Sequence, residues 1–146
     1  MSGATQDVAP LNLHGSAVAL DGRGLLILGA AGAGKSGLAL SLMALGARLV
    51  ADDRVLLERR GDAVAAAAPP ALRGLIEARG VGILRAEAVE TATLALAVDL
   101  DAAPEARMPH LRDIRLFELR IELISGRGVP NLAAILVQML RSGRAG

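Results

Sequence analysis

Apolar residues in this chain come in short runs separated by turns with glycine or paired charges, a pattern typical of a sheet with few helices. The runs predict strands over residues 11–20, 24–28, 47–51, 55–58, 94–98 and 115–124, and a strand or loop over the alanine-rich segment before Pro69. Longer runs without proline predict helices over residues 36–45 and 132–141. Gly46 is expected to end the first helix and Asn131 to cap the second.

The first two runs are separated by Asp21-Gly22, a dipeptide that favours the tight turn of a β-hairpin. The strand at residues 24–28 is therefore expected to be the second arm of a hairpin, which makes the sheet at least partly antiparallel. His14 lies near the start of the first arm. Continued pairing would bring it opposite the end of the second arm, next to Gly29.

Two later segments alternate charged and apolar residues. Residues 115–124 are predicted to be one amphipathic strand with Leu116, Glu118, Arg120 and Glu122 on one side. Residues 74–85 carry glycines among apolar residues, and Glu77 and Arg79 would share one face of an extended strand. Backbone running close to a ligand would explain this segment, and so would an ordinary strand with a bulge and a surface ion pair.

The strand at residues 24–28 leads into a sequence that fits the phosphate-binding pattern G-x-x-x-x-G-K-[ST]. Its residues are Gly29, Ala30, Ala31, Gly32, Ala33, Gly34, Lys35 and Ser36. Between a strand and a helix, the backbone N–H groups of such a loop converge on phosphate oxygens. Lys35, the only lysine of the chain, would reach the β- and γ-phosphates, and the Ser36 hydroxyl would hold Mg²⁺. The alternative is a chance match in a chain rich in alanine and glycine.

Asp52 and Asp53 follow the strand after this helix. Ten helical residues carry the chain about 15 Å away from the loop, and five strand residues return it by about 17 Å. Strand alternation would send the two carboxylates to different faces. One could then face Mg²⁺ and the other an incoming hydroxyl group as a base. An exposed turn before the next strand is the alternative.

The composition excludes several classes of function. At 146 residues the chain is expected to form one domain over residues 1–146, with flexible tails at residues 1–10 and 142–146. There is no cysteine for a disulfide, a thiolate metal site or a nucleophile. A net charge of +1 and a single aromatic residue argue against a nucleic-acid partner. The sequence shows no signal peptide and no membrane span, so a cytoplasmic location is expected.

Taken in order, four stretches resemble the catalytic domain of HPr kinase/phosphorylase, which phosphorylates a serine of the phosphocarrier HPr and can remove that phosphate. These stretches are His14-Gly15, GAAGAGKS, LVADD at residues 49–53 and IEARGVGIL at residues 76–84. The resemblance implies a P-loop kinase domain of the HPr kinase and PEP-carboxykinase-like type, an α/β fold with a mixed sheet. It also implies ATP and Mg²⁺ as ligands, an HPr-type phosphocarrier as partner in regulation of the phosphotransferase system, and a homo-oligomer, a hexamer in this family.

The resemblance also assigns roles to individual residues. Ser36 and Glu77 correspond to Mg²⁺ ligands, and the spacing favours Asp52 for the metal side. One aspartate of the pair corresponds to the base in phosphorylation and the acid in the reverse reaction, and the spacing favours Asp53 for this role. His14 matches the active-site histidine of the family, and Arg107 the arginine in the loop before the last strand. For His14 and Arg107, ordinary solvent-exposed side chains are the alternative.

Some residues depart from the family pattern. Gly37 stands where the family usually has glutamate after the loop serine, and GRGVPN at residues 126–131 is only a remnant of the loop tied to dephosphorylation. The chain resembles a short proteobacterial form without the N-terminal domain. We therefore expect a protein-serine kinase, while phosphorylase activity and the donor, ATP or pyrophosphate, stay open. A nucleotide-responsive protein that binds a phosphocarrier without turnover and a small-molecule P-loop kinase are the alternatives.

Overall fold

The structure is a computed structural model, and it describes residues 9–107 and 110–145. Its strands are β1 (Leu11–His14), β2 (Ser16–Leu20), β3 (Arg23–Leu28), β4 (Arg48–Ala51), β5 (Arg54–Arg60), β6 (Ala63–Ala67), β7 (Leu75–Ala78), β8 (Gly82–Arg85), β9 (Thr91–Asp99), β10 (Arg112–Leu116) and β11 (Leu119–Ser125). Its helices are α2 (Lys35–Ala44), α3 (Leu132–Ser142) and the 3-10 helix η1 (Pro70–Leu72). The tail predicted at residues 1–10 lies mostly outside the described residues.

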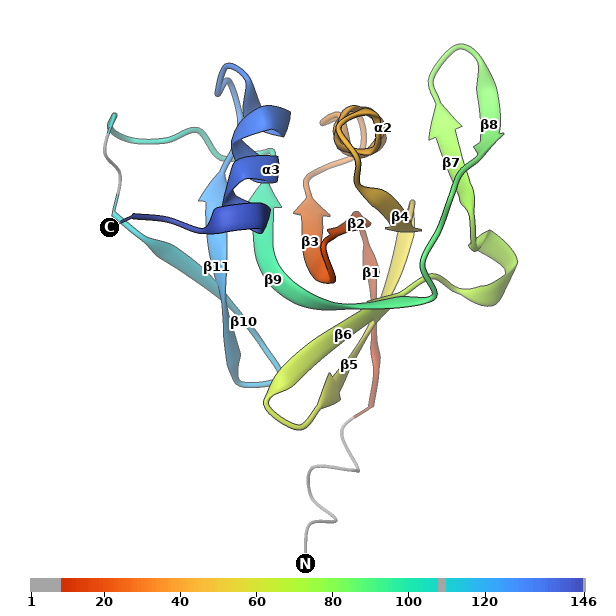
Figure 1. Ribbon diagram of the computed structural model, residues 1–146, viewed down its shortest axis with the longest axis horizontal. Coiled ribbons are helices and arrows are strands. Elements are labelled where there is room, and N and C mark those ends of the chain that lie inside the picture. Colours follow the sequence, from red (N-terminus) through yellow and green to blue (C-terminus); the bar gives the residue numbers. More distant parts are fainter. Residues whose placement is uncertain (1–8, 108–109, 146) are drawn as a thin grey trace, which may run out of the picture.

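A mixed, curled sheet of nine strands forms the body of the molecule (Figure 1). Its main path runs in the order β1-β5-β6-β9-β3-β2-β4. The long strand β9 runs parallel to β3 along one side, while its other side pairs first with β6 and then with β11. Only these β9 pairings with β3 and β11 are parallel among the named strand pairs of the described chain. The predicted α/β fold with a mixed sheet is confirmed.

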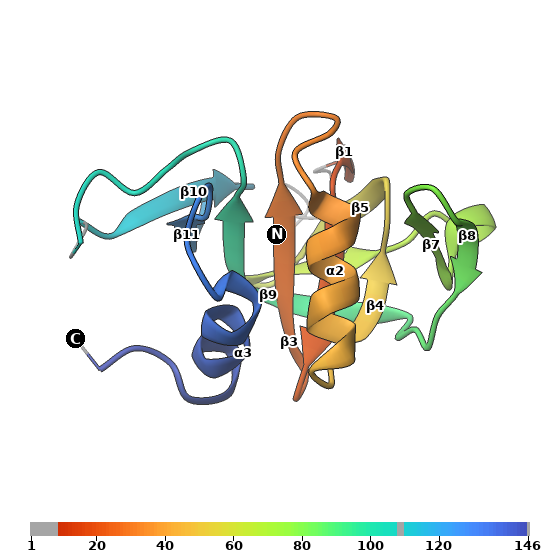
Figure 2. The same cartoon turned by 90° about the horizontal axis from the view of Figure 1, so that it is seen from above.

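Two hydrophobic clusters lie on opposite faces of this sheet. Successive residues of β2 divide between them, since Ala17 belongs to one cluster and Val18 to the other. The helices α2 and α3 cover one face, where Leu42 and Leu136 are completely buried (Figure 2). The curl of the sheet encloses the second cluster, to which β5, β6, β10 and β11 contribute. Burial of both faces explains why the central strands are apolar at successive positions.

The predicted hairpin about Asp21-Gly22 is present as the β2–β3 pair. Both turn residues have positive φ, 52° and 78°, as a two-residue hairpin turn of type I′ requires. The first arm is shorter than predicted, because only Ser16–Leu20 pair with β3. The residues before Gly15 form a separate strand, β1, which pairs with β5. His14 consequently lies opposite Arg54 in β5, and the expectation that it pairs near Gly29 is wrong.

Helix α2 begins and ends within one residue of its predicted limits. Gly34 precedes it with a φ of 100°, and Gly46 follows it with a φ of 111°. The N–H groups of Gly46 and Ala47 donate to the carbonyls of Met43 and Leu42, at 3.0 Å each. This is a Schellman cap, and it confirms Gly46 as the residue that ends the helix. Asn131 precedes α3 as predicted, with a φ of 58° and no hydrogen bond from its side chain to the helix.

Residues 115–124 do not form the single amphipathic strand that their alternation predicts. The chain turns at Phe117 and Glu118, with φ values of 53° and 67°, to connect β10 and β11 as a hairpin. Neither residue type favours such a turn. Partial burial of Phe117 against the cluster inside the curled sheet holds it, together with a hydrogen bond from the Arg59 guanidinium to the Phe117 carbonyl (3.1 Å). Tertiary packing therefore overrides the local pattern.

Residues 74–85 form a hairpin of their own, β7–β8, that stands off the main sheet (Figure 1). The turn includes Arg79 and Gly80, and the φ of Gly80 is 81°. Glu77 and Arg79 therefore do not share a strand face, contrary to the prediction for one extended strand. The hairpin carries Glu77 to the edge of the sheet where the phosphate-binding motif lies.

Candidate active site

The candidate site lies where three strands end at one edge of the sheet. Strands β3 and β9 are parallel neighbours, and β4 runs in the same direction because both β3 and β4 are antiparallel to β2. The motif Gly29–Ser36 follows β3, and Asp52 follows β4. The carboxyl ends of parallel strands are the usual place for ligands in open α/β sheets. The return of the aspartates to the loop, expected from element lengths, is what this topology produces.

The motif folds as a loop that leads directly into α2 (Figure 2). Gly32 and Gly34 have φ values of 85° and 100°, which favour glycine, and the first N–H groups of α2 have no partner within the helix. Lys35 is 8% exposed as a residue, and its ammonium donates to the carbonyls of Gly29 (2.8 Å) and Ala30 (3.0 Å). The single lysine therefore folds back along the loop, in reach of any phosphate bound there.

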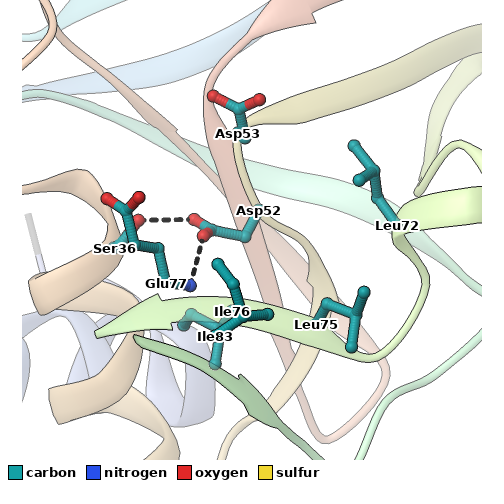
Figure 3. A pocket seen from close by; sticks show the side chains of 8 residues that line it. All are labelled: Ser36, Asp52, Asp53, Leu72, Leu75, Ile76, Glu77 and Ile83. Atoms are coloured by element: carbon teal, nitrogen blue, oxygen red, sulfur yellow. Dashed lines mark hydrogen bonds between the residues drawn. The ribbon is translucent and has the colours of Figure 1, made fainter. Parts of the chain in front are cut away.

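Asp52 is 5% exposed and accepts hydrogen bonds at both carboxylate oxygens. Its Oδ1 accepts from the hydroxyls of Ser16 and Ser36, at 2.7 Å each, and its Oδ2 accepts from the Glu77 N–H at 3.0 Å. Figure 3 shows the bonds from Ser36 and Glu77. These donors fix the carboxylate beside the serine of the phosphate-binding motif. Sequence reasoning missed Ser16, although it is the one polar residue of the otherwise apolar strand β2 and follows His14-Gly15 directly.

Asp53 points away from Asp52 and its side chain is 68% exposed (Figure 3). Its Oδ1 lies 3.4 Å from Nε2 of His14. Strand alternation does not cause the separation of the two carboxylates, because β4 ends at Ala51. Instead, the Arg54 N–H donates to the Asp52 carbonyl (2.9 Å) and closes a three-residue turn around Asp53, whose φ is 71°. The Gly15 N–H donates to the Asp53 carbonyl (3.1 Å) and ties this turn to the sheet.

A cavity of about 290 Å³ lies between this turn and the β7–β8 hairpin. Ser36, Asp52, Asp53 and Glu77 supply its polar lining, and apolar residues complete the wall (Figure 3): Leu72, Leu75, Ile76 and Ile83. The cavity therefore has a polar side next to the phosphate-binding motif and an apolar side beyond it. An acceptor group that enters here would reach Asp53 from solvent.

The donor set around Ser36 fits Mg²⁺ bound together with a nucleotide. The Ser36 hydroxyl donates its hydrogen bond to Asp52 and keeps its lone pairs for a metal. Within residues 9–107 and 110–145, no three histidine or acidic side chains converge as an independent metal site. Mg²⁺ usually combines one or two carboxylates with phosphate oxygens and water, so a nucleotide would have to complete the coordination.

No hydrogen bond or ion pair in the described part of the chain connects Arg107 to the other predicted site residues. The Arg107 side chain is exposed in the loop after β9, next to residues 108–109, which lie outside the described part. A role for Arg107 stays a prediction.

Asp101 is a second neighbour of the loop that sequence reasoning missed. It follows β9, the strand next to β3, and its Oδ2 accepts the Ala30 N–H at 2.9 Å. Its position shortly after the strand predicted at residues 94–98 was the available signal, but the parallel pairing of that strand with β3 could not be read from local patterns.

Comparison with known proteins identifies the family. The family model of the HPr serine kinase C-terminal domain matches residues 6–94, which is more than half of the chain. The chain belongs to this family. The match does not include β10, β11 and α3. For these elements, only the fold is compared with a known protein, in the structural comparison below. Within the described residues, no helix has the length and apolar character needed to cross a membrane.

Among HPr kinase/phosphorylases, the protein of Lactobacillus acidophilus is 46% identical over 74 residues, which is 50% of this chain and 23% of that protein. The protein of Caldanaerobacter subterraneus is 46% identical over 81 residues, 54% of this chain and 27% of that protein. The aligned part thus spans about a quarter of these relatives. The HPr(Ser) kinase/phosphatase structure from Coxiella burnetii has the same fold, with a TM-score of 0.76, 24% identity, and coverage of 90% of this chain and 94% of that one.

Proposed function

We propose that the chain is an ATP-dependent protein-serine kinase that acts on an HPr-type phosphocarrier. The observation that carries the proposal is the division between two adjacent carboxylates. Asp52 is buried against the serine of the phosphate-binding motif, and Asp53 is exposed beside His14 at the cavity wall. Membership of the HPr serine kinase family supports the choice of acceptor.

In the proposed reaction, the loop N–H groups and the Lys35 ammonium bind the β- and γ-phosphates of ATP. Ser36 and Asp52, with Glu77 from the same polar side of the cavity, would hold Mg²⁺. Bound Mg²⁺ supplies positive charge against the phosphate oxygens. Asp53 accepts the proton of the acceptor serine as the serine Oγ forms its bond to the γ-phosphorus and the bond from that phosphorus to the ADP oxygen breaks. The products are ADP and phosphoserine, and the proton stays on Asp53 until solvent takes it.

His14 would assist by orienting Asp53, since its Nε2 is 3.4 Å from Asp53 Oδ1. The exposed position of the pair leaves Asp53 accessible to a protein acceptor rather than only to a small molecule. Most of the catalytic effect would come from positioning and from neutralising charge, as is usual in phosphoryl transfer.

The test is to incubate the protein with labelled ATP and Mg²⁺ and with each purified phosphocarrier from the same genome. Transfer of label to a serine of one carrier, and its loss in the Lys35→Ala variant, is the expected result. Repeating the assay with pyrophosphate in place of ATP identifies the donor. Labelling of no carrier, with ATP binding intact, would contradict the proposal.

Gly37 favours one second candidate, a nucleotide-responsive protein that binds the carrier without phosphorylating it. The helix position next to Ser36 carries no side chain, and a Cβ added to Gly37 would meet no atom within 4 Å. A side chain could therefore begin at this position, but the carboxylate of the glutamate that is usual in the family is missing. Carrier binding that depends on ATP and proceeds without labelling would support this candidate.

A further inference from the structure

The peptide group between Gly29 and Ala30 is held from both sides. Its carbonyl, on Gly29, accepts from the Lys35 ammonium at 2.8 Å, and its N–H, on Ala30, donates to Oδ2 of Asp101 at 2.9 Å. The peptide thus links the only lysine of the chain to a carboxylate from the loop after β9. Rotation of this peptide would break both hydrogen bonds at once.

Asp101 is itself held in place by the end of the sheet. Its N–H donates to Oδ1 of Asp99 at 2.9 Å, and the Leu100 N–H donates to the Leu28 carbonyl at 2.8 Å. The neighbouring β3–β9 pairing reaches Leu28 and Asp99, so the strand ladder fixes the backbone on both sides of the contact. The turn at the end of β9 therefore presents the carboxylate to the start of the phosphate-binding loop.

Close packing restricts the movement of this peptide, and Asp101 supplies the hydrogen-bond partner of its N–H. A Cβ on Gly29 would lie 3.0 Å from the Ala33 Cβ and 3.2 Å from the Leu100 Cβ, so the backbone approaches both residues without a side chain of its own. Residue 30 is an exposed alanine and offers no polar side chain. Among the hydrogen bonds described for the chain, that of Asp101 is the one made by the Ala30 N–H.

The charge and the hydrogen bond of Asp101 should have opposite effects on nucleotide binding. A carboxylate next to a phosphate site repels a bound anion, so charge alone would lower the affinity for a nucleotide. The hydrogen bond that it accepts would act in the opposite direction, by holding the Gly29–Ala30 peptide in one conformation before phosphate binds. Asparagine at this position would keep an acceptor oxygen and remove the charge, whereas alanine would remove both.

We propose that Asp101 is a positioning residue of the nucleotide site, which fixes the Gly29–Ala30 peptide and thereby orients the loop and Lys35 for ATP. The inference rests on the proposed function for the identity of the ligand. It goes further in assigning part of the nucleotide affinity to a residue outside the phosphate-binding motif.

The experiment compares Asp101→Ala and Asp101→Asn with the unchanged protein. Equilibrium binding of Mg²⁺-ATP, measured without a phosphocarrier, is the first readout. Because one charge-assisted hydrogen bond at an exposed site is lost, binding to the alanine variant should weaken about fivefold. The asparagine variant should bind at least as tightly as the unchanged protein. Glu105→Ala, a change of an exposed carboxylate in the same loop, is the matched control and should leave binding unchanged.

Kinetics separate positioning from a general loss of structure. The alanine variant should show a raised KM for ATP with kcat within about twofold of the unchanged protein, because saturating nucleotide restores the loop. Thermal unfolding of all variants checks that the fold is kept. Equal binding by the alanine variant and the unchanged protein would overturn the proposal, and so would tighter binding by both Asp101 variants, which would mean that only charge matters. Absence of phosphoryl transfer in every variant, with the binding differences present, would contradict the proposed kinase function and leave this inference standing.

Discussion

Ser16 offers the most direct test of how the buried carboxylate is held. The residue is 1% exposed, and its hydroxyl donates to Asp52 Oδ1 at 2.7 Å. Replacing it with alanine removes one of the two hydroxyl donors from that oxygen and leaves the Ser36 hydroxyl and the Glu77 N–H. A hydrogen bond to a charged group contributes about 1.5–3 kcal/mol, so the Ser16→Ala variant should lose stability of that order.

This loss should appear as a lower midpoint of thermal unfolding. For a chain of this size each kcal/mol corresponds to about 2–4 °C, which gives a decrease of roughly 3–12 °C. Ser41 lies on the exposed side of α2, and Ser41→Ala is the matched control. It removes the same hydroxyl from a solvated position and should leave the midpoint within about 2 °C.

The same variant should also need more Mg²⁺ for activity. Residues that orient a metal ligand typically change metal affinity by 10–100-fold, so the Mg²⁺ concentration for half-maximal phosphoryl transfer should rise about tenfold or more. Excess Mg²⁺ should restore most of the rate, because Asp52 itself is intact. A Ser16→Ala variant with the unfolding midpoint and the Mg²⁺ dependence of the Ser41→Ala control would refute the assignment of Ser16 as a support of Asp52.

Three other substitutions test the local structure around this site and elsewhere. Gly15→Ala should destabilise the protein by about 1–3 kcal/mol in chemical denaturation, because its Cβ would lie 2.9 Å from the Ile27 carbonyl oxygen and force the Asp53 turn to move. Gly37→Ala should stabilise it by about 0.5–1 kcal/mol in the same measurement, since α2 has open space there and alanine favours helix. Glu118→Gly should raise the thermal midpoint slightly, because glycine adopts the φ of 67° at this position without the backbone strain that glutamate has there. A decrease for the last two, or no change for the first, would contradict these readings.

The phosphate-binding loop and the aspartate pair could be predicted because local rules govern them. The motif Gly29–Ser36 has fixed spacing, and the lengths of α2 and β4 determine where Asp52 returns. The division between Asp52 and Asp53 was also predicted, although its cause was not. The positive φ of Asp53 depends on hydrogen bonds from Gly15 and Arg54, and strand periodicity carries no information about them.

Contacts between distant segments could not be read from local patterns. Ser16 and Asp101 reach the site through β2 and β9, whose pairing partners depend on the whole sheet. The turn at Phe117 uses residues that disfavour it, and packing of that ring together with the Arg59 hydrogen bond compensates. In both cases tertiary structure decides what the local sequence leaves open.

In the proposed reaction, two adjacent carboxylates perform different tasks in transfer of the ATP γ-phosphoryl group to a protein serine. The measurement that tests it is the initial rate of carrier phosphorylation by Asp52→Asn and Asp53→Asn over a range of Mg²⁺ concentrations at saturating ATP. The account predicts that Asp53→Asn lowers the rate about 100-fold or more at every Mg²⁺ concentration, with ATP affinity little changed. Asp52→Asn should raise the Mg²⁺ requirement and regain part of its rate at high Mg²⁺. Rates equal to those of the unchanged protein for both variants would contradict the account.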